Sequence, residues 1–419
     1  MTPFAHQALG LFIALRLGDA INIAAGLWLV PCYIATEDLG AVLPATSFAT
    51  FLAIPAFAFG FIFMREATRL ACAREYGKLK SLVRGVFAGI GCLLLLALAV
   101  AACLMPGFLG YLRVPDSAAG FLVIASAFLG CVAPVYMDAL NALKRFKAVG
   151  TIEIISSAAR FLALLVLLPI RAFAGYFAGG AVQPLVRIMG ALLALRRELS
   201  APAEPFWSKG TMRRIAILFI GVTAYLSAPM FAGLVEQTLL RTELTAAESA
   251  GYYLATRLTD VLNTITFPLL LVLFPYASEA TEQRSSIRPL VLRCSAVTLA
   301  AAAAFALVCA ICGEKLLALL PNGCNALPYA RHLPLLIATS ALTACQNFCT
   351  NAEIAAGRFG FLAWFIPLHL AYPAALYVWA RCETLASGHF LAAFAFAALL
   401  RFLGAAVTLH KQTRTNSEA

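Results

Sequence analysis

The sequence predicts an all-α polytopic membrane protein of about 12 transmembrane helices, arranged as two pseudo-twofold-related six-helix lobes around a central cavity. Composition is the first observation behind this fold class, because 62% of the 419 residues are hydrophobic and only 12% are charged. Soluble globular chains are about half apolar and about a quarter charged. The other two observations are a series of long apolar runs and an internal repeat that divides the chain into halves.

The apolar runs are each long enough to cross a bilayer, which takes about 20 residues of α-helix. Short polar segments separate them, and the longest polar segment, RRELSAPAEPFWSKGTMRR at 196–214, leaves six runs on either side. The predicted spans are 8–35, 40–64, 84–105, 118–140, 148–170, 172–195, 215–238, 248–275, 289–312, 330–352, 359–380 and 384–409.

The distribution of positive charge predicts the orientation. The net charge is +11, and twenty of the 31 Lys and Arg residues fall in the loops that are cytoplasmic if the N-terminus is inside, against six in the opposite loops. Because Lys and Arg collect on cytoplasmic loops, we expect both termini in the cytoplasm and the chain in the cell inner (cytoplasmic) membrane. This placement indicates loop charges rather than a nucleic-acid-binding patch, so no nucleic acid partner is expected.

Short matches recur in the two halves at one nearly constant offset. Glu37 and Gly40 correspond to Glu248 and Gly251, and REAT at the end of the second span corresponds to SEAT at the end of the eighth. An even number of spans in each half gives both halves the same orientation, related by an axis along the membrane normal. The predicted domains are an N-terminal lobe at 1–196, a cytoplasmic linker at 197–214, a C-terminal lobe at 215–410 and a cytoplasmic tail at 411–419.

Two apolar runs contain the same polar pattern, RLGDAIN at 16–22 and RLTDVLN at 257–263. In a helix, residues at i, i+3 and i+6 lie close to one face, so Arg, Asp and Asn form one stripe in each. A charge at the bilayer centre costs at least about 2.5–3.5 kcal/mol on insertion scales. One interpretation is an intrahelical ion pair that eases insertion. The other is a hydrated cavity in which the arginines bind an anion, because the guanidinium fork suits phosphate oxygens.

The cavity interpretation includes further residues of the same and other spans. The predicted substrate-binding residues, which would form an anion site, are Arg16, Arg257, Arg160, Arg187, Asn22, Asn263 and Tyr253. Asp19 and Asp260, which lie within the two stripes, are possible coupling carboxylates.

Three other charges within the spans are expected to have local roles. Arg401 lies towards the cytoplasmic end of its span, so we expect its side chain to snorkel to the interface. Glu236 ends the seventh span and is interpreted either as a solvated cap or as a gating residue. Glu153 is expected to be a helix N-terminal charge favoured by the helix dipole.

Segments around the second, seventh and eighth spans resemble bacterial lipid-linked oligosaccharide flippases. VEQTLLRTELTAAESAGYYLATRL at 235–258 is similar to the junction between the seventh and eighth spans of that family, and VLFPYASEA at 272–280 to its exit from the eighth. FGFIFMREATRLACAREYGKLK at 59–80 is similar to its exit from the second. The positions that carry the junction motif are Glu236, Leu239, Leu240, Gly251, Tyr252, Tyr253 and Arg257.

This resemblance implies the superfamily of multidrug, oligosaccharidyl-lipid and polysaccharide exporters, in its polysaccharide biosynthesis (O-antigen type) flippase branch. A member of that branch is expected to move a polyprenyl-diphosphate-linked oligosaccharide across the cytoplasmic membrane by alternating access, for surface polysaccharide or lipopolysaccharide biosynthesis. Its partners would be the lipid-linked oligosaccharide substrate, membrane lipids and polysaccharide polymerases. The alternative is a cation-coupled multidrug exporter of the same superfamily.

Motifs of the common enzyme classes are missing from the sequence. It has no GxxxxGKS or GxxxxGKT loop for nucleotide phosphates, no GxSxG elbow and no HExxH pattern. Two Cys pairs, Cys309/Cys312 and Cys345/Cys349, have a spacing that zinc ligands can have, but they lie inside predicted apolar spans, so we interpret them as buried apolar side chains. We therefore expect no enzymatic activity, no metal and no cofactor. A membrane polymerase or ligase is disfavoured because it would be expected to carry a large polar domain.

Overall fold

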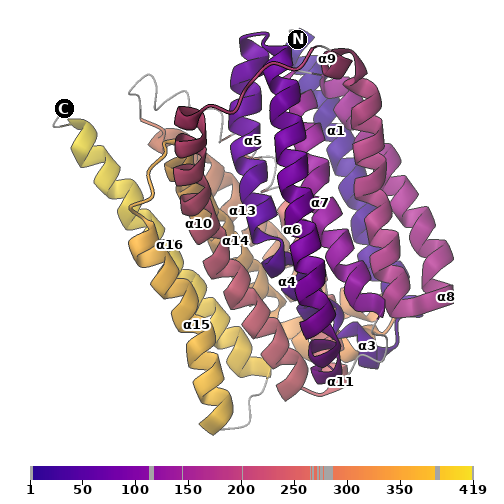
Figure 1. The fold of residues 1–419 in the computed structure, drawn as a ribbon. Helices are drawn as coiled ribbons and strands as arrows, with labels where there is room; N and C mark the ends of the chain where they lie inside the picture. The colour runs from indigo at the N-terminus through magenta and orange to yellow at the C-terminus, as the bar shows by residue number, and fades with distance from the viewer. Residues whose placement is uncertain are drawn as a thin grey trace. The chain divides into compact units, whose positions relative to one another are not determined.

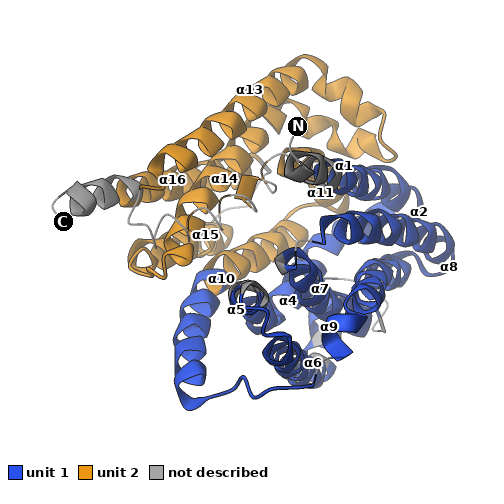
Figure 2. Ribbon diagram, turned by 90° about the horizontal axis from the view of Figure 1, so that it is seen from above, with its two compact units in different colours: residues 1–226 blue, residues 227–419 orange. Residues whose placement is uncertain are grey.

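Every regular element that the structure describes is a helix. The structure is a computed structural model, and it describes residues 3–112, 118–143, 145–200, 202–264, 266, 269–270, 273, 277, 286–382 and 387–417. The chain forms two compact units, Met1–Leu226 (unit 1) and Ser227–Ala419 (unit 2), coloured separately in Figure 2. The boundary between the units lies inside one helix, and the lobes, linker and tail defined from the sequence stay predictions.

Unit 1 extends from the first helix to the first part of α10, and Figure 1 labels most of its helices. Its elements are α1 (Pro3–Ala24), the π-helical turn η1 (Ala25–Leu29), α2 (Val30–Tyr33), α3 (Thr36–Leu39), α4 (Val42–Leu52), α5 (Ile54–Cys72), α6 (Tyr76–Tyr111), α7 (Ala118–Ala142), α8 (Phe146–Ala194), α9 (Arg196–Ser200) and the start of α10 (Lys209–Glu243). The chain bends by 63° between α4 and α5. Pro55 lies in the first turn of α5, where its missing N–H costs no helical hydrogen bond.

The longest helical segment, α8, doubles back on itself. Arg171 and Ala172 have non-helical backbone angles and divide it into two legs, at the position where the sequence predicts the fifth span to end and the sixth to begin. The legs are closely packed: a Cβ on Gly179 in the second leg would stand 2.7 Å from a methyl carbon of Leu164 in the first. Figure 1 shows α8 beside α7 and α1, the helices against which it packs.

Unit 2 contains the rest of α10 and the elements that follow it. They are α11 (Ala246–Thr259), the 3-10 turn η2 (Asp260–Leu262), α13 (Arg288–Ala318), the 3-10 helix η3 (Gly323–His332), α14 (Leu333–Ala355), α15 (Leu362–Cys382) and α16 (Ser387–Ser417). A capping box starts α11, because the Thr245 hydroxyl accepts from the Glu248 amide and the Glu248 carboxylate accepts from the Thr245 amide.

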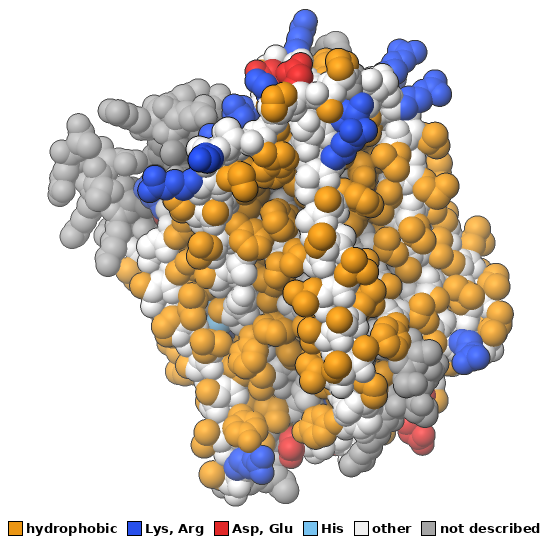
Figure 3. Space-filling view, viewed as in Figure 1, with side chains coloured by type: hydrophobic (Ala, Val, Ile, Leu, Met, Phe, Trp, Pro, Cys, Tyr) orange, Lys and Arg blue, Asp and Glu red, His pale blue; other side chains and the backbone are white. Residues whose placement is uncertain are grey.

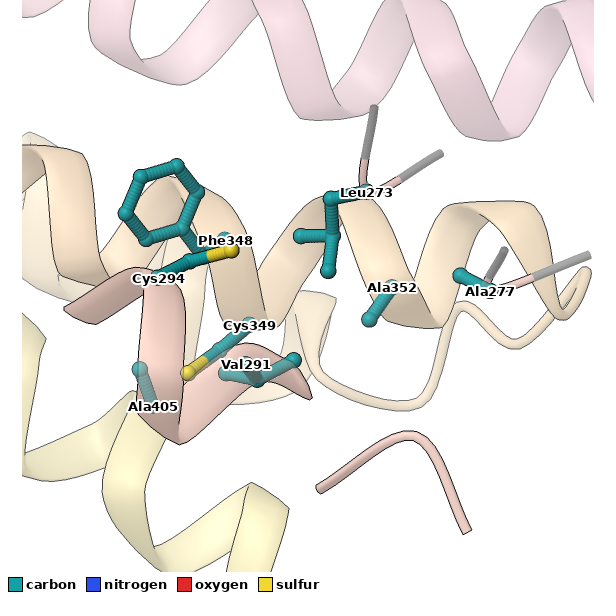
Figure 4. Packing of buried hydrophobic residues seen from close by; sticks show 8 residues of the cluster. All are labelled: Leu273, Ala277, Val291, Cys294, Phe348, Cys349, Ala352 and Ala405. Carbon is teal, nitrogen blue, oxygen red and sulfur yellow. The ribbon is translucent and has the colours of Figure 1, made fainter. Parts of the chain in front are cut away.

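Small and apolar side chains let the helices of unit 2 pack closely. One cluster joins α13, α14 and α16 with two described residues of the segment before α13 (Figure 4). Its members are Leu273, Ala277, Val291, Cys294, Phe348, Cys349, Ala352 and Ala405. In a membrane the lipid tails are as apolar as these side chains, so close van der Waals packing, rather than removal of apolar surface from water, favours such contacts between helices.

The described helices carry apolar side chains on their outer faces. Figure 3 shows hydrophobic side chains along the sides of the helices, with Lys and Arg concentrated towards the helix ends. Eight described helices are long and apolar enough to cross a membrane, or nine when the bent α4–α5 pair is counted as a span. One of the eight is α8, which holds two of the twelve predicted spans, while seven of the 28 residues of predicted span 248–275, all of them after residue 264, lie outside the described residues. The protein is therefore an all-α, multi-pass membrane protein, as predicted.

Candidate functional site

The predicted stripe on α1 forms an ion pair along one helix face. The Arg16 guanidinium contacts the Asp19 carboxylate at 2.9 Å and lies 5.5 Å from the centre of the Phe12 ring. Both charged side chains are partly exposed, at 20% for Arg16 and 38% for Asp19. The pair is thus neutral as a unit and still accessible.

The stripe on α11 and η2 repeats this arrangement. Arg257 contacts Asp260 at 3.0 Å and lies 5.3 Å from the centre of the Tyr253 ring. Asn263 donates a hydrogen bond of 3.1 Å to the second oxygen of Asp260. In both units, therefore, an arginine lies between an aromatic ring four residues earlier and an aspartate three residues later.

A network of amides and hydroxyls joins α1 to both legs of α8. Arg160 donates a hydrogen bond of 2.6 Å to the Asn22 side-chain oxygen, and the Asn22 amide donates one of 3.3 Å to the Ser157 hydroxyl. From the second leg, Gln183 donates to the same hydroxyl at 3.1 Å. Ser157 is fully buried, so the network lies in the interior of unit 1.

An ion pair between Glu153 and Arg187 links the two legs of α8 beside this network. The interpretation of Glu153 as a helix N-terminal charge is wrong, because α8 begins at Phe146 and Glu153 is a buried residue two turns further on. Gly18 on α1 packs against the same region. A Cβ at Gly18 would stand 3.0 Å from the Ser157 hydroxyl oxygen, so the glycine lets α1 approach α8 closely.

A second polar cluster is buried in unit 2, and sequence reasoning did not find it. Glu236 on α10 accepts a hydrogen bond of 3.1 Å from the Tyr252 hydroxyl on α11. Arg401 on α16 interacts electrostatically with the same carboxylate, and Tyr372 on α15 lies beside it. Both charged residues are 6% exposed. Glu236 is therefore no solvated cap, and Arg401 does not snorkel to the interface: its Nε donates to the Ala397 carbonyl at 3.1 Å.

The structure brings some of the predicted site residues together. In unit 1, Arg160 on α8 contacts Asn22 on α1, Arg187 pairs with Glu153 across the two legs of α8, and Arg16 pairs with Asp19 within α1. In unit 2, α11 and η2 hold Tyr253, Arg257, Asp260 and Asn263. That the two groups serve one substrate stays a prediction.

Ser157 and Gln183 are site residues that sequence reasoning missed, although a signal for them exists. Ser157 precedes Arg160 by three residues, and Gln183 precedes Arg187 by four, so each shares a helix face with a predicted arginine. Within the described residues, no group of three or more His, Cys, Asp and Glu side chains could hold a metal ion.

No known sequence family and no curated protein sequence matches the chain. Solved structures do. An inward-facing multidrug resistance MATE family transporter of the MOP superfamily is 15% identical, with a TM-score of 0.65 and 96% of each chain covered. The Vibrio cholerae MATE transporter VcmN in its bent form is 16% identical, with a TM-score of 0.69 and 98% of this chain and 97% of that chain covered.

A third structure extends the likeness to another state of such transporters. The outward-facing conformation of a multidrug resistance MATE family transporter of the MOP superfamily is 12% identical, with a TM-score of 0.68 and 98% of this chain covered. At these identities the likeness concerns the fold. The chain therefore has a MATE-like fold over nearly its whole length.

Proposed function

We propose that the protein is a transporter that moves a polyprenyl-diphosphate-linked oligosaccharide across the cytoplasmic membrane by alternating access. The MATE-like fold supports transport as the general activity. The substrate class rests on a separate observation: unit 1 holds three arginines, Arg16, Arg160 and Arg187, in the interior of α1 and α8, helices that are otherwise apolar.

A diphosphate group suits these side chains. Arginine presents a planar fork of N–H donors that binds phosphate oxygens in pairs. A charge inside a membrane is costly unless it is paired, so arginine and diphosphate would neutralise each other during passage. The polyprenyl tail would stay in the lipid, and the reaction needs no covalent step.

The aspartates of the two stripes have a defined part in this proposal. Asp19 and Asp260 hold the guanidinium groups of Arg16 and Arg257 while no substrate is bound. The diphosphate competes with each carboxylate for the same N–H donors. Protonation of the aspartates would release the arginines, so these two residues are the proposed coupling carboxylates.

Reconstitution into liposomes tests the function directly. Protein-containing vesicles receive a fluorescent polyprenyl-diphosphate oligosaccharide, and a membrane-impermeant glycosidase reports how much of the sugar is exposed outside. We expect the protein to increase the rate at which sugar from the inner leaflet becomes accessible. A rate equal to that of protein-free vesicles would contradict the proposal.

A cation-coupled multidrug exporter is the second candidate, because the structural neighbours are multidrug MATE transporters. The same vesicles can be loaded with a fluorescent cationic dye under a proton or sodium gradient. Dye transport without movement of the lipid-linked sugar would establish this alternative. The arginines of unit 1 argue against it, since a cationic dye would be repelled by a site with excess positive charge.

The cell inner membrane, with both termini in the cytoplasm, is the proposed location of the protein. The excess of Lys and Arg in the predicted cytoplasmic loops supports this orientation. A polysaccharide polymerase is the proposed protein partner, since it would consume the translocated lipid-linked sugar. Protease protection of an N-terminal tag in right-side-out vesicles tests the orientation.

A further inference from the structure

We infer that Arg160, unlike Arg16, binds the phosphate oxygens of the substrate without displacing a carboxylate, and that Asn22 holds it ready to do so. The inference rests on the proposed function and assigns the anion-binding role to one of its candidate arginines. It also gives Asn22, Ser157 and Gln183 a positioning role that the sequence did not predict.

Charge balance distinguishes Arg160 from its neighbours. Arg16 is neutralised by Asp19, and Arg187 by Glu153. Arg160 instead donates to a neutral amide oxygen, and among the described residues no carboxylate lies within ion-pair distance of it. Within the part of the chain that the structure describes, the charge of Arg160 is therefore not balanced by a carboxylate.

The position of Arg160 along the helix makes this charge significant. The first leg of α8 runs from Phe146 to the break at Arg171, and Arg160 lies near its midpoint. At about 1.5 Å per residue it is roughly 21 Å from the start of the helix and about 17 Å from the break. The hydrocarbon core of a bilayer is about 30 Å thick, so Arg160 lies deep in the span. An unpaired charge at that depth is costly, and a bound anion would lower this cost.

The hydrogen-bond network leaves Arg160 able to bind an anion. Asn22 engages a single N–H of the guanidinium, at 2.6 Å, and a guanidinium has five N–H donors. The side chain is only partly buried, so further donors remain accessible to an oxyanion. Asn22 is itself fixed, because its amide donates to Ser157, which also accepts from Gln183.

The decisive variant is Asn22→Asp, which has nearly the same shape as the wild type. It places a carboxylate against Arg160 and so balances the charge without removing the arginine. The probe is farnesyl diphosphate, with inorganic diphosphate as a second probe that lacks the lipid tail. Binding to the purified full chain in detergent is measured by calorimetry, and thermal unfolding is followed in parallel.

We expect Asn22→Asp and Arg160→Gln each to weaken binding of both diphosphates by about tenfold or more, the loss typical of a charge-assisted hydrogen bond. Asn22→Asp should unfold at the wild-type temperature or higher, because it gains an ion pair. Ser157→Ala should weaken binding by a smaller factor. Arg213→Gln, which removes an exposed charge at the start of α10, is the matched control and should bind like the wild type.

The outcomes separate this inference from the proposed function. Wild-type affinity for farnesyl diphosphate in both Asn22→Asp and Arg160→Gln would overturn the role of Arg160 and leave flipping intact. Loss of diphosphate binding in those variants, in a protein that flips no lipid-linked sugar in vesicles, would uphold the role of Arg160 and refute the function. A wild-type protein that binds neither probe would overturn the inference, and the vesicle assay would then decide the function.

Discussion

Glu66 on α5 accepts hydrogen bonds of 2.9 and 3.0 Å from Arg214 at the start of α10. Arg69 donates to the same carboxylate at 3.2 Å. The Glu66 side chain is only 3% exposed, so this polar contact fastens the beginning of α10 to unit 1. Nearby, Trp207 covers Gly85 on α6, where a Cβ would stand 2.6 Å from the indole nitrogen. The polar segment before α10 is therefore docked on unit 1.

Replacing Glu66 by Gln should destabilise the protein. Arg214 and Arg69 lose the charge that holds them, and a buried charge-assisted hydrogen bond contributes about 1.5–3 kcal/mol. We expect a clear fall in the unfolding midpoint in detergent. Glu75→Gln is the control, because the Glu75–Lys78 pair is more than a third exposed and such pairs contribute about 0–1 kcal/mol. Equal effects of the two substitutions would show that the Glu66 contact does not stabilise α10.

The Glu236–Arg401 cluster should show strong coupling in a double-mutant cycle. Glu236 and Arg401 are both buried and interact electrostatically, so removing either charge leaves the other less well compensated. Glu236→Gln and Arg401→Met should each destabilise unit 2, whereas the double variant should cost clearly less than their sum. Thermal unfolding in detergent measures all four proteins. Strictly additive losses would mean that the two charges do not interact.

Local spacing in the sequence predicted the contacts within each helix. The i, i+3 rule placed Arg257, Asp260 and Asn263 on one face, and the structure shows their contacts at 3.0 and 3.1 Å. Composition likewise predicted the membrane fold, because apolar runs of helical length have few other solutions. These inferences need only the residues of one helix, and a single sequence contains all of them.

Contacts between helices could not be predicted in the same way. Asn22 and Ser157 are 135 positions apart, and nothing in one sequence says which face of α8 meets α1. The burial of a charged side chain cannot be predicted from one sequence either. The environments of Glu236 and Arg401 were predicted from their distance to the span ends, but helix packing decides their burial. The predicted count of twelve spans similarly depends on hairpins such as the one in α8, which hydropathy alone does not define.

Gly251 should be intolerant of a methyl group. A Cβ there would overlap the carbonyl oxygen of Asn325 and stand 3.0 Å from the Tyr329 ring. Gly251→Ala should push η3 away from α11 and cost about 1–3 kcal/mol, as overpacking does. Gly233→Ala is the matched control, because nothing lies within 4 Å of its Cβ position and alanine favours a helix interior. A lower unfolding midpoint for Gly233→Ala than for Gly251→Ala would contradict the packing of η3.

The hairpin in α8 predicts the sidedness of its ends. A straight helix of 49 residues would be roughly 74 Å long, more than twice the thickness of the hydrocarbon core, which is about 30 Å. In a cysteine-free background, Lys147→Cys and Arg196→Cys should react with an impermeant maleimide from one side of the membrane. Arg171→Cys should react from the other side. Labelling of all three from the same side would exclude two membrane-crossing legs.

Variants of the two matching stripes, on α1 and on α11 with η2, test whether the ion pairs bind substrate or only ease insertion into the membrane. Arg16→Gln with Asp19→Asn, and Arg257→Gln with Asp260→Asn, remove each ion pair as a neutral unit. Neither double variant leaves a lone charge in the span, so both should reach the membrane in normal amounts. If the arginines contact the diphosphate, flipping should fall about tenfold or more with either pair removed, and to background with both. Undiminished flipping with all four residues changed would show that the pairs only ease insertion. The anion would then have to be bound elsewhere, and Arg160 and Arg187 would be the remaining candidates in unit 1.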